Sequence, residues 1–416
     1  MKEFAQRELL SNSMKSSAGN TFHQWGGRIA LFFSYTHLSH DMTTGLLGAL
    51  LPFIRQDLGL NYMQSGLLVS AYALTAGFSQ VLGGIVGDRL SRQKTIALGL
   101  GGVGLCAIAI GLTSSYYALL GILIVMGVLS GAYHPSAVST ITSYFEKERR
   151  GKAIALHMVG GSFGFGIAPF VGAAISSALN WHYAFIFLCL PALVAVPLVL
   201  TQLKLPAKSA EAVSMAAQSV STAESDHGLS AMSRVFRNVA GVVVIVLIVH
   251  LVIGPAMSFF PLYLVDKHNL STAAASSWMT VLRIGGVAGS LFGGWLADKW
   301  GRKRAIFATL VALGPVFFLL TWFPFNAALI VDFIVFGMLG TMREATTQAY
   351  LMDSTPTAVR ATVFGIYFGV GQEGSSLIQP VVGHYMDIVG IESVFTVTAL
   401  ITIALSVTAI FLARKA

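Results

Sequence analysis

The chain has 416 residues, of which 55% are hydrophobic and 11% are charged, and its mean hydropathy is +0.73. This much apolar surface excludes an ordinary soluble protein of the same length and indicates a protein that spans the lipid bilayer. The formal net charge of +8 does not indicate nucleic-acid binding, because the basic residues follow a pattern of membrane topology.

Twelve apolar segments of roughly 20 residues or more are predicted to be membrane-spanning helices. They lack the alternation over about ten residues that marks the strands of a transmembrane barrel. The fold class is therefore predicted as an all-α membrane protein with twelve transmembrane helices. In chain order the spans cover about 28–54, 63–87, 94–113, 117–143, 151–177, 182–203, 238–264, 273–297, 304–323, 327–352, 359–385 and 392–412.

The basic residues predict how these helices are oriented. With the twelve spans above, 22 of the 26 lysines and arginines lie on one side of the membrane, only Arg55 and Lys267 lie on the other, and Arg283 and Arg343 fall inside spans. Since cytoplasmic loops are enriched in Lys and Arg, both termini are expected to be cytoplasmic, in a cell (inner) membrane. Residues 1–25 lack the apolar core of a cleavable signal peptide.

A long polar stretch in the middle of the chain separates six spans from six. Residues 204–237 are rich in Ala and Ser and poor in aromatic residues, which is typical of a flexible linker. The predicted organisation is a cytoplasmic N-terminal tail (1–27), a six-helix bundle (28–203), a cytoplasmic linker (204–237) and a second six-helix bundle (238–413).

The two halves repeat one template at a constant offset of 210 residues. The clearest copy is a charged turn, GGIVGDRLSRQKT at 83–95 and GGWLADKWGRKRA at 293–305. A constant offset through several loops and spans indicates an internal repeat, and such repeats build transporters whose site lies near the bilayer midplane. The offset pairs Asp88 with Asp298, Arg89 with Lys299, Arg92 with Arg302, Arg150 with Arg360, His40 with His250 and His134 with Glu344.

This charged turn resembles the signature loop of the major facilitator superfamily, whose pattern is G-x-x-x-D-[RK]-x-x-[RG]-x-[KR]. The first copy, 84–94, departs from the pattern only at Ser91, where Gly is usual, and the second copy, 294–304, fits it closely. The resemblance covers essentially the whole chain. It implies two pseudo-symmetric six-helix bundles in which the first and fourth spans of each half line a central cavity.

The same resemblance implies that charges in these loops latch the two halves together on the cytoplasmic side. The alternative is a basic loop that only sets topology, although topology alone does not require the repeated aspartate. The predicted gating residues are Asp88, Arg89, Arg92, Arg150, Asp298, Lys299, Arg302 and Arg360.

Ionisable residues inside the spans are candidates for function, since a charge at bilayer depth costs roughly 2.5–3.5 kcal/mol on insertion scales. His37 and Asp41 lie one helical turn apart on one face of the first span, where a carboxylate favours the charged form of a nearby histidine. Together with His134 in the fourth span and Glu344 in the tenth, they are the predicted proton-coupling residues. For the lone histidines of spans 5 and 7, the alternative is a hydrogen bond to a backbone carbonyl of a neighbouring helix.

Clustered His and Arg residues predict a small organic anion as substrate, with a carboxylate or phosphonate bound by an arginine. Arg343 and Glu344 are adjacent, so they point in different directions around the helix and cannot neutralise each other. Arg283 is either an anion clamp or the structural partner of an acid such as Glu373. The predicted substrate-binding residues are Arg343, Arg283, His40, His250, Glu373 and Tyr133.

Span 5 carries a second family resemblance. Residues 160–174, GGSFGFGIAPFVGAA, are similar to the antiporter motif of drug–proton exchangers, with Gly164, Pro169 and Gly172 in register and Ala168 in place of the usual Gly. The alternative is helix packing through small residues and a proline kink.

Spans 1 and 4 resemble those of the fosmidomycin-resistance family of exporters, which have a histidine and an aspartate in span 1 and a His-Pro pair in span 4. His37, Asp41, His134 and Pro135 match those positions. The tenth span, MREATTQAYLMDS, does not resemble that family, so the resemblance does not identify the substrate.

The predicted function is a secondary active transporter that moves a small organic solute by proton-coupled alternating access, with export by antiport implied by the resemblance. The alternative is a proton-coupled symporter for uptake of a monocarboxylate or a similar organic acid. A different class is a transporter-like receptor or lipid flippase without proton coupling, and the short termini and linker argue against a receptor.

An enzyme is not expected, because the sequence has neither a nucleophile elbow nor a paired-cysteine motif. The lack of an ATP-binding glycine loop argues against direct nucleotide drive of transport. No metal site is expected, because the histidines lack the clustered spacing of metal ligands, and no cofactor is expected. The expected partners are a small-molecule substrate, protons and the lipid bilayer around a single chain, without nucleic acid.

Overall fold

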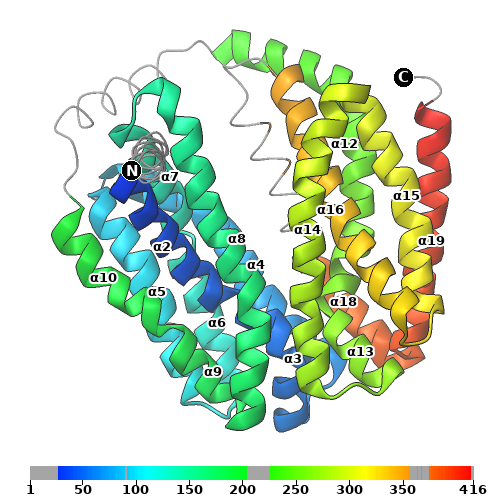
Figure 1. The fold of residues 1–416 in the computed structure, drawn as a ribbon, viewed down its shortest axis with the longest axis horizontal. Helices are drawn as coiled ribbons and strands as arrows, with labels where there is room; N and C mark the ends of the chain where they lie inside the picture. The colour runs from blue at the N-terminus through cyan, green and yellow to red at the C-terminus, as the bar shows by residue number, and fades with distance from the viewer. Residues whose placement is uncertain are drawn as a thin grey trace, which may run out of the picture.

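The computed structural model describes residues 27–89, 91–203, 225–355 and 374–413, together with Val363 and Tyr367. Figure 1 shows two helical bundles side by side, with the N-terminal half on the left and the C-terminal half on the right. The predicted fold class is confirmed: the protein is an all-α membrane protein with twelve transmembrane helices in two pseudo-symmetric six-helix bundles.

Three spans of the N-terminal half are each made of two consecutive helices. In chain order the helices of this half are α2 (Gly27–Thr44), α3 (Leu46–Leu58), α4 (Tyr62–Arg89), α5 (Arg92–Gly111), α6 (Tyr116–Ser130), α7 (Tyr133–Tyr144), α8 (Lys147–Ala178), α9 (Trp181–Leu188) and α10 (Leu190–Gln202). The interrupted spans are α2–α3, α6–α7 and α9–α10, which are the first, fourth and sixth.

The C-terminal half repeats this order. Its described helices are α12 (Ser225–Ser258), α13 (Phe260–His268), α14 (Thr272–Trp300), α15 (Arg302–Trp322), α16 (Ala327–Ser354), α18 (Gly374–Val389) and α19 (Ile391–Ala413). Its first span is again made of two consecutive helices, α12 and α13, separated by Phe259. Helix α12 begins inside the predicted linker, because the Ala, Ser, Met and Arg residues of that segment are compatible with a helix.

Among the described residues, eight segments are long and apolar enough to cross a membrane by composition alone. The first, second, tenth and eleventh predicted spans are not among them. The first and tenth carry several polar and charged residues along their length, including His37, Asp41, Arg343 and Glu344.

Two of the interruptions flank the polar residues of the first and fourth spans. Helices α2 and α3 are separated by Gly45, one turn after Asp41. Helices α6 and α7 are separated by Gly131 and Ala132, because Pro135 has no N–H to donate to the Gly131 carbonyl. Broken helices of this kind are typical of transporter sites, where irregular backbone lies inside the protein rather than against lipid.

Helices α2 and α8 pack with their backbones in contact because α8 presents glycines to α2. A Cβ atom at Gly161 would overlap with the ring of His37, and one at Gly164 would overlap with the backbone oxygen of Leu38. Further along, a Cβ atom at Gly172 would lie 2.7 Å from Leu46 Cδ2, and the buried Pro169 lies within α8. Small residues therefore bring α8 close to the first span.

The two halves meet mainly along α4 with α18 and α8 with α14, and α3 also packs against α13 and α14, where Leu51 joins the apolar core of the C-terminal half. At the first contact Ser70 Oγ donates to the Ser376 carbonyl at 2.6 Å. At the second, Thr280 Oγ1 donates to the Gly166 carbonyl at 2.9 Å. These hydrogen bonds join backbone to side chain across the boundary between the halves.

The halves are tied most firmly at the end of the molecule opposite the termini, which we call the distal end. Arg55 and Asp266 form an ion pair of 2.7 Å across the boundary, and Tyr62 donates its hydroxyl to the same carboxylate. The Asp387 carboxylate accepts from the backbone N–H groups of Tyr62 at 2.8 Å and Met63 at 3.0 Å. It therefore caps α4 from the opposite half.

At the opposite end, the residues that the structure describes show no equivalent tie. Within the described ranges, no hydrogen bond or ion pair joins the two halves near the ends of α4, α5, α14 and α15 that face the termini. The structure is thus closed between the halves at the distal end.

We expect Asp387→Ala to weaken this closure, because loss of an N-terminal cap costs about 1 kcal/mol. Spin labels at Gln56→Cys and Asn269→Cys, in a background with Cys106 and Cys189 replaced by Ser, would report the separation of the halves. The distance distribution should extend to longer values in the variant. Glu392→Gln is the matched control, because Glu392 pairs with Lys267 of its own half at 3.8 Å. Identical distributions for the Asp387→Ala protein and its parent would contradict the assignment.

We expect Gly161→Ala to destabilise the N-terminal half, since overpacking costs about 1–3 kcal/mol. The control is Gly151→Ala on the same helix, where a Cβ atom meets nothing within 4 Å. That change should be neutral or stabilising, because Ala favours a helix over Gly by about 1 kcal/mol. Thermal unfolding midpoints in detergent measure both effects, and equal midpoints would refute the close contact.

Candidate functional site

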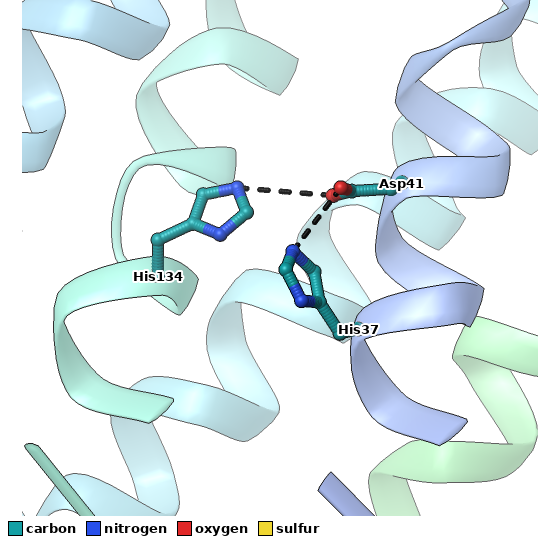
Figure 2. Close-up of side chains that lie close together, drawn as sticks. All are labelled: His37, Asp41 and His134. Atoms are coloured by element: carbon teal, nitrogen blue, oxygen red, sulfur yellow. Dashed lines mark ion pairs between the residues drawn. The ribbon is translucent and has the colours of Figure 1, made fainter. Parts of the chain in front are cut away.

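A cluster of histidines surrounds Asp41 in the N-terminal half. Figure 2 shows His37 and Asp41 on one face of α2 with His134, at the start of α7, directed toward the same carboxylate. His37 Nε2 lies 3.1 Å from Asp41 Oδ2, and His134 Nε2 lies 3.8 Å from Oδ1. His40 Nδ1 contacts Oδ1 at 2.8 Å. The first and fourth spans therefore meet at one carboxylate.

Sequence spacing and one helix break explain this convergence. His37 and Asp41 are four residues apart in a helix, which places them on the same face. The break before Pro135 makes His134 the second residue of a new helix, whose first turn approaches α2.

The hydrogen bonds of His37 determine where a proton is needed. Its Nδ1 lies 2.9 Å from the backbone carbonyl of His157, and a carbonyl can only accept, so Nδ1 donates. In a neutral His37 ring, Nε2 is then an acceptor that faces Asp41 Oδ2, another acceptor when the carboxylate is ionised. Two acceptors at this distance require a positive charge between them, and a single shared proton supplies it.

His40 does not need such a proton. Its Nδ1 donates to Asp41, and its Nε2 accepts from Ser130 Oγ at 3.1 Å, so a neutral ring satisfies both contacts. The His40 ring also stacks on Tyr133 with 4.6 Å between centroids. His40 therefore orients the carboxylate that His37 and His134 approach.

His157, the histidine of the fifth span, bonds to a backbone carbonyl of a neighbouring helix, which is the alternative expected for it from the sequence. His157 Nδ1 lies 2.9 Å from the Phe33 carbonyl, and its ring stacks on His37 with 4.1 Å between centroids. It is fully buried, and its Nε2 has no hydrogen-bond partner among the described residues. Asp41 and His134 are the accessible members of the cluster, with 19% and 34% of their side-chain surface exposed.

The structure also contradicts the expectation that the spacing of the histidines along the sequence keeps them from forming a metal site. One ligand-type atom from each of His37, Asp41 and His134 lies within 4.8 Å of the others, because the fold joins two separate spans. Two imidazoles and one carboxylate are donors that suit a transition metal. Both Asp41 oxygens already have an imidazole partner within 3.1 Å, however, so a metal ion would have to displace at least one of these contacts.

In the C-terminal half, Arg343 occupies the position that the offset of 210 pairs with Tyr133. Arg343 Nη2 lies 3.2 Å from His250 Nδ1, and Nη1 donates to the Val246 carbonyl at 3.3 Å. A guanidinium only donates, so His250 accepts through Nδ1 and its ring is neutral with the hydrogen on Nε2. Arg343 is 9% exposed, its buried Nε lacks a partner, and it forms no ion pair with any acid in the described part of the chain.

The 210-residue offset relates these contacts to those of the N-terminal half. Positions 246, 250 and 343 correspond to Thr36, His40 and Tyr133. Tyr133 OH lies 2.8 Å from Thr36 Oγ1, and its ring stacks on His40. The repeat thus keeps the same three positions in contact, while a tyrosine in one half is replaced by a guanidinium in the other.

Arg283 lies at the contact between the halves. Its guanidinium carbon is 4.3 Å from the centre of the Phe165 ring, which belongs to α8 of the other half. The side chain is exposed and forms no ion pair among the described residues. The Glu344 carboxylate accepts a hydrogen bond from Gln348 at 3.1 Å and forms no ion pair with Arg283 or Arg343. Glu373 lies outside the described residues, so its pairing with Arg283 stays a prediction.

The charged turn of the C-terminal half forms ion pairs within its own half. Arg302 donates to Asp298 at 2.7 Å and to Asp353 at 2.9 Å, and Lys299 lies over the Trp295 ring at 4.8 Å. Asp298 is therefore paired inside one half in this closed-distal arrangement, and a latch between halves stays a prediction.

The gating residues of the N-terminal half are described only in part. Arg92 contacts the Ser139 carbonyl at 3.5 Å, and Arg150 Nε donates to the Phe145 carbonyl at 2.9 Å. The side chains of Asp88 and Arg89, and the whole of Arg360, lie outside the described residues.

Sequence reasoning missed Phe165, Ser130 and Thr36. No local signal marks a phenylalanine that will contact an arginine of the other half. The offset of 210 pairs Thr36 with Val246, but the contact of Val246 with Arg343 that makes this pairing informative comes from the structure.

Comparison with known proteins agrees with this architecture. The family model described as Major Facilitator Superfamily matches residues 33–380 and 242–416. The fosmidomycin resistance protein of Escherichia coli (strain K12) is 23% identical over 373 residues, which is 88% of each chain. The cis,cis-muconate transport protein of Acinetobacter baylyi is 22% identical over 386 residues, 90% of each chain.

The fold is also that of a solved transporter. The crystal structure of the nucleoside transporter NupG covers 92% of this chain and 98% of its own with a TM-score of 0.73 at 16% identity. Two six-helix halves related by an internal repeat, a family model that matches almost the whole chain and this shared fold lead to one assignment. The chain belongs to the major facilitator superfamily.

Proposed function

We propose that this protein, a multi-pass transporter of organic solutes by its family, moves a small organic anion by proton-coupled alternating access. The observation that carries the proposal is the difference between the two halves. The His37–Asp41 contact in one half is a pair of acceptors that requires a positive charge. The buried Arg343 in the other half offers only donors and forms no ion pair among the described residues.

The proton-coupling role falls to Asp41 and His37, with His134 as the accessible group beside them. A proton shared by His37 and Asp41 makes the pair neutral, and its loss leaves one negative charge inside the membrane. His134, with 34% of its side chain exposed, can pass a proton between this pair and water. Glu344 is the corresponding titratable position of the C-terminal half.

The anion-binding role falls to Arg343 and Arg283, which remain charged at every physiological pH. Arg343 is oriented by His250 and the Val246 carbonyl, so its remaining N–H groups are available to an oxyanion. The other residues proposed to line the substrate site are His40, His250, Tyr133 and Glu373.

The remaining parts of the proposal concern the working cycle. The charged turns close the cytoplasmic side when the distal end opens. Their residues are Asp88, Arg89, Arg92 and Arg150 in one half and Asp298, Lys299, Arg302 and Arg360 in the other. Gly164, Pro169 and Gly172 support the contact of α8 with the first span. The protein works as a single chain in a cell (inner) membrane with both termini cytoplasmic.

Two directions of transport are compatible with this site. Export by antiport is supported by similarity to the fosmidomycin resistance protein. Uptake of a carboxylic acid by symport is supported by similarity to the cis,cis-muconate transport protein.

We expect Asp41→Asn to abolish proton-driven transport, because asparagine cannot carry the shared proton. Proteoliposomes with an imposed pH gradient and either cis,cis-muconate or fosmidomycin as probe should lose about tenfold or more of the driven flux. Exchange of labelled for unlabelled probe without a gradient should persist. His384→Gln, an exposed histidine on α18, is the control. Unchanged driven flux in both Asp41→Asn and Glu344→Gln would rule out this proton assignment.

We expect Arg343→Gln to weaken binding of both probes by about ten- to hundredfold, because hydrogen bonds to charged groups contribute about 1.5–3 kcal/mol. Arg343→Lys should be intermediate, since an ammonium keeps the charge but not the two-pronged geometry. Lys152→Gln removes an exposed positive charge from α8 and should leave affinity unchanged. Calorimetry on purified protein measures all three, and wild-type affinity in Arg343→Gln would exclude this residue from the site.

A further inference from the structure

His37, Asp41 and His134 bring two imidazole rings and one carboxylate to a single place between α2 and α7. One ligand-type atom from each lies within 4.8 Å of the other two, and Figure 2 shows both rings directed toward the carboxylate. Two imidazoles and a carboxylate, with a further position left for water, are ligands of Zn²⁺ and of neighbouring first-row dications. The residue types therefore suit a transition metal.

The separations between these atoms are close to those between two ligands of one ion. Zn²⁺ lies about 2.0–2.1 Å from a histidine nitrogen and about 2.0–2.2 Å from a carboxylate oxygen, so two such ligands at a tetrahedral angle are about 3.4 Å apart. His37 Nε2 lies 3.1 Å from Asp41 Oδ2, and His134 Nε2 lies 3.8 Å from Asp41 Oδ1. The two measured distances bracket the expected one, and the His134 side chain, which is 34% exposed, has room to move closer.

Hydrogen bonds around the cluster already hold two of these ligands in the form that a metal requires. A histidine bound to a metal almost always donates its other ring N–H to a carbonyl, a carboxylate or water. His37 donates through Nδ1 to the His157 carbonyl at 2.9 Å, so the lone pair on its Nε2 is directed at Asp41. His40 Nδ1 donates to Asp41 Oδ1 at 2.8 Å, which fixes the carboxylate with Oδ2 facing His37.

The charges around Asp41 also allow a cation to enter. His37 Nε2 and Asp41 Oδ2 are two acceptors that need a positive charge between them, and a metal ion supplies it as a proton does. Among the described residues, the ion-pair partners of Asp41 are histidines, and no lysine or arginine pairs with it. Histidine binds a metal in its neutral form, so these partners place no permanent positive charge against the ion.

We propose that His37 Nε2, the Asp41 carboxylate and His134 Nε2 bind one divalent transition-metal ion such as Zn²⁺. The ion enters the contact between His37 and Asp41, while the hydrogen bond from His40 to Asp41 stays in place. Water completes the coordination at the accessible side of the cluster, where 34% of the His134 side chain and 19% of the Asp41 side chain are exposed.

A metal at this site excludes the shared proton, because both would occupy the same contact between His37 Nε2 and Asp41 Oδ2. It also joins the first and fourth spans through direct bonds to α2 and α7. The ion would therefore inhibit any step of transport in which that proton moves. Binding of the metal does not itself depend on the proposed function, so it can be measured without a substrate.

Titration of the full-length purified protein with Co²⁺, after removal of any affinity tag, tests this site. Co²⁺ accepts the same ligands as Zn²⁺, and its visible absorption bands are intense only when few ligands surround the ion. We expect one equivalent of Co²⁺ to produce intense bands and an excess of Zn²⁺ to remove them by displacement. Isothermal titration calorimetry then measures the affinity for Zn²⁺ directly.

Variants assign the metal to the cluster. His134→Gln should weaken Zn²⁺ binding by more than about hundredfold, because loss of a hydrogen-bond partner of a ligand already costs about 10- to 100-fold. The partly exposed His134 can be replaced without disturbing the buried rings of the cluster. Asp41→Asn should likewise abolish the Co²⁺ bands. His384→Gln, which removes an exposed histidine from α18, should leave both measurements unchanged.

Two outcomes would overturn the metal site. Bands and affinity that persist in both His134→Gln and Asp41→Asn would show that the metal binds elsewhere. The absence of measurable Zn²⁺ binding to the wild-type protein would also reject the site. Neither result bears on the proton assignment, which the driven flux of the Asp41→Asn protein tests separately.

Discussion

The contact between His37 Nε2 and Asp41 Oδ2 is the interaction on which the rest of this site depends. At 3.1 Å, with Nδ1 committed to the His157 carbonyl, two hydrogen-bond acceptors face each other inside a membrane-spanning bundle. Such a contact is stable only with a positive charge between the atoms. The fold therefore creates a place where one shared proton stabilises the contact and its departure leaves an unfavourable charge, which is the basis of the proton-coupling role proposed above.

The backbone of α8 makes this contact possible. Gly161 leaves room for the His37 ring, and the carbonyl of His157, one turn earlier on the same helix, selects the tautomer of that ring. Lipid offers little hydrophobic gain for helix association, so close packing and interhelical hydrogen bonds hold α2 and α8 together. The same helix then reaches the other half through Phe165 and Gly166, which contact Arg283 and Thr280. One helix thus links the proton cluster to the boundary between the halves.

The internal repeat keeps its geometry while the chemistry of its two copies diverges. Tyr133 and Arg343 occupy equivalent positions, and each contacts the histidine of the first span of its half, His40 or His250. In the N-terminal half imidazole rings surround a carboxylate, and the His37–Asp41 contact lacks a donor unless a proton is shared. In the C-terminal half the Arg343 guanidinium donates to His250 and to the Val246 carbonyl. The duplicated scaffold therefore keeps its geometry while its two halves carry side chains of different charge.

Apolar length, charge asymmetry and a constant offset can be read directly from the order of the residues, so the twelve spans and the two halves were predictable, and the charged turn carried the resemblance to the superfamily. The spacing also indicated His37 with Asp41, since four residues in a helix define one face. The packing of the helices, in contrast, brings His134 to the same carboxylate, makes His37 donate through Nδ1 and places Phe165 against Arg283. These contacts depend on the rotation and depth of neighbouring helices, which the pattern of any single segment does not specify.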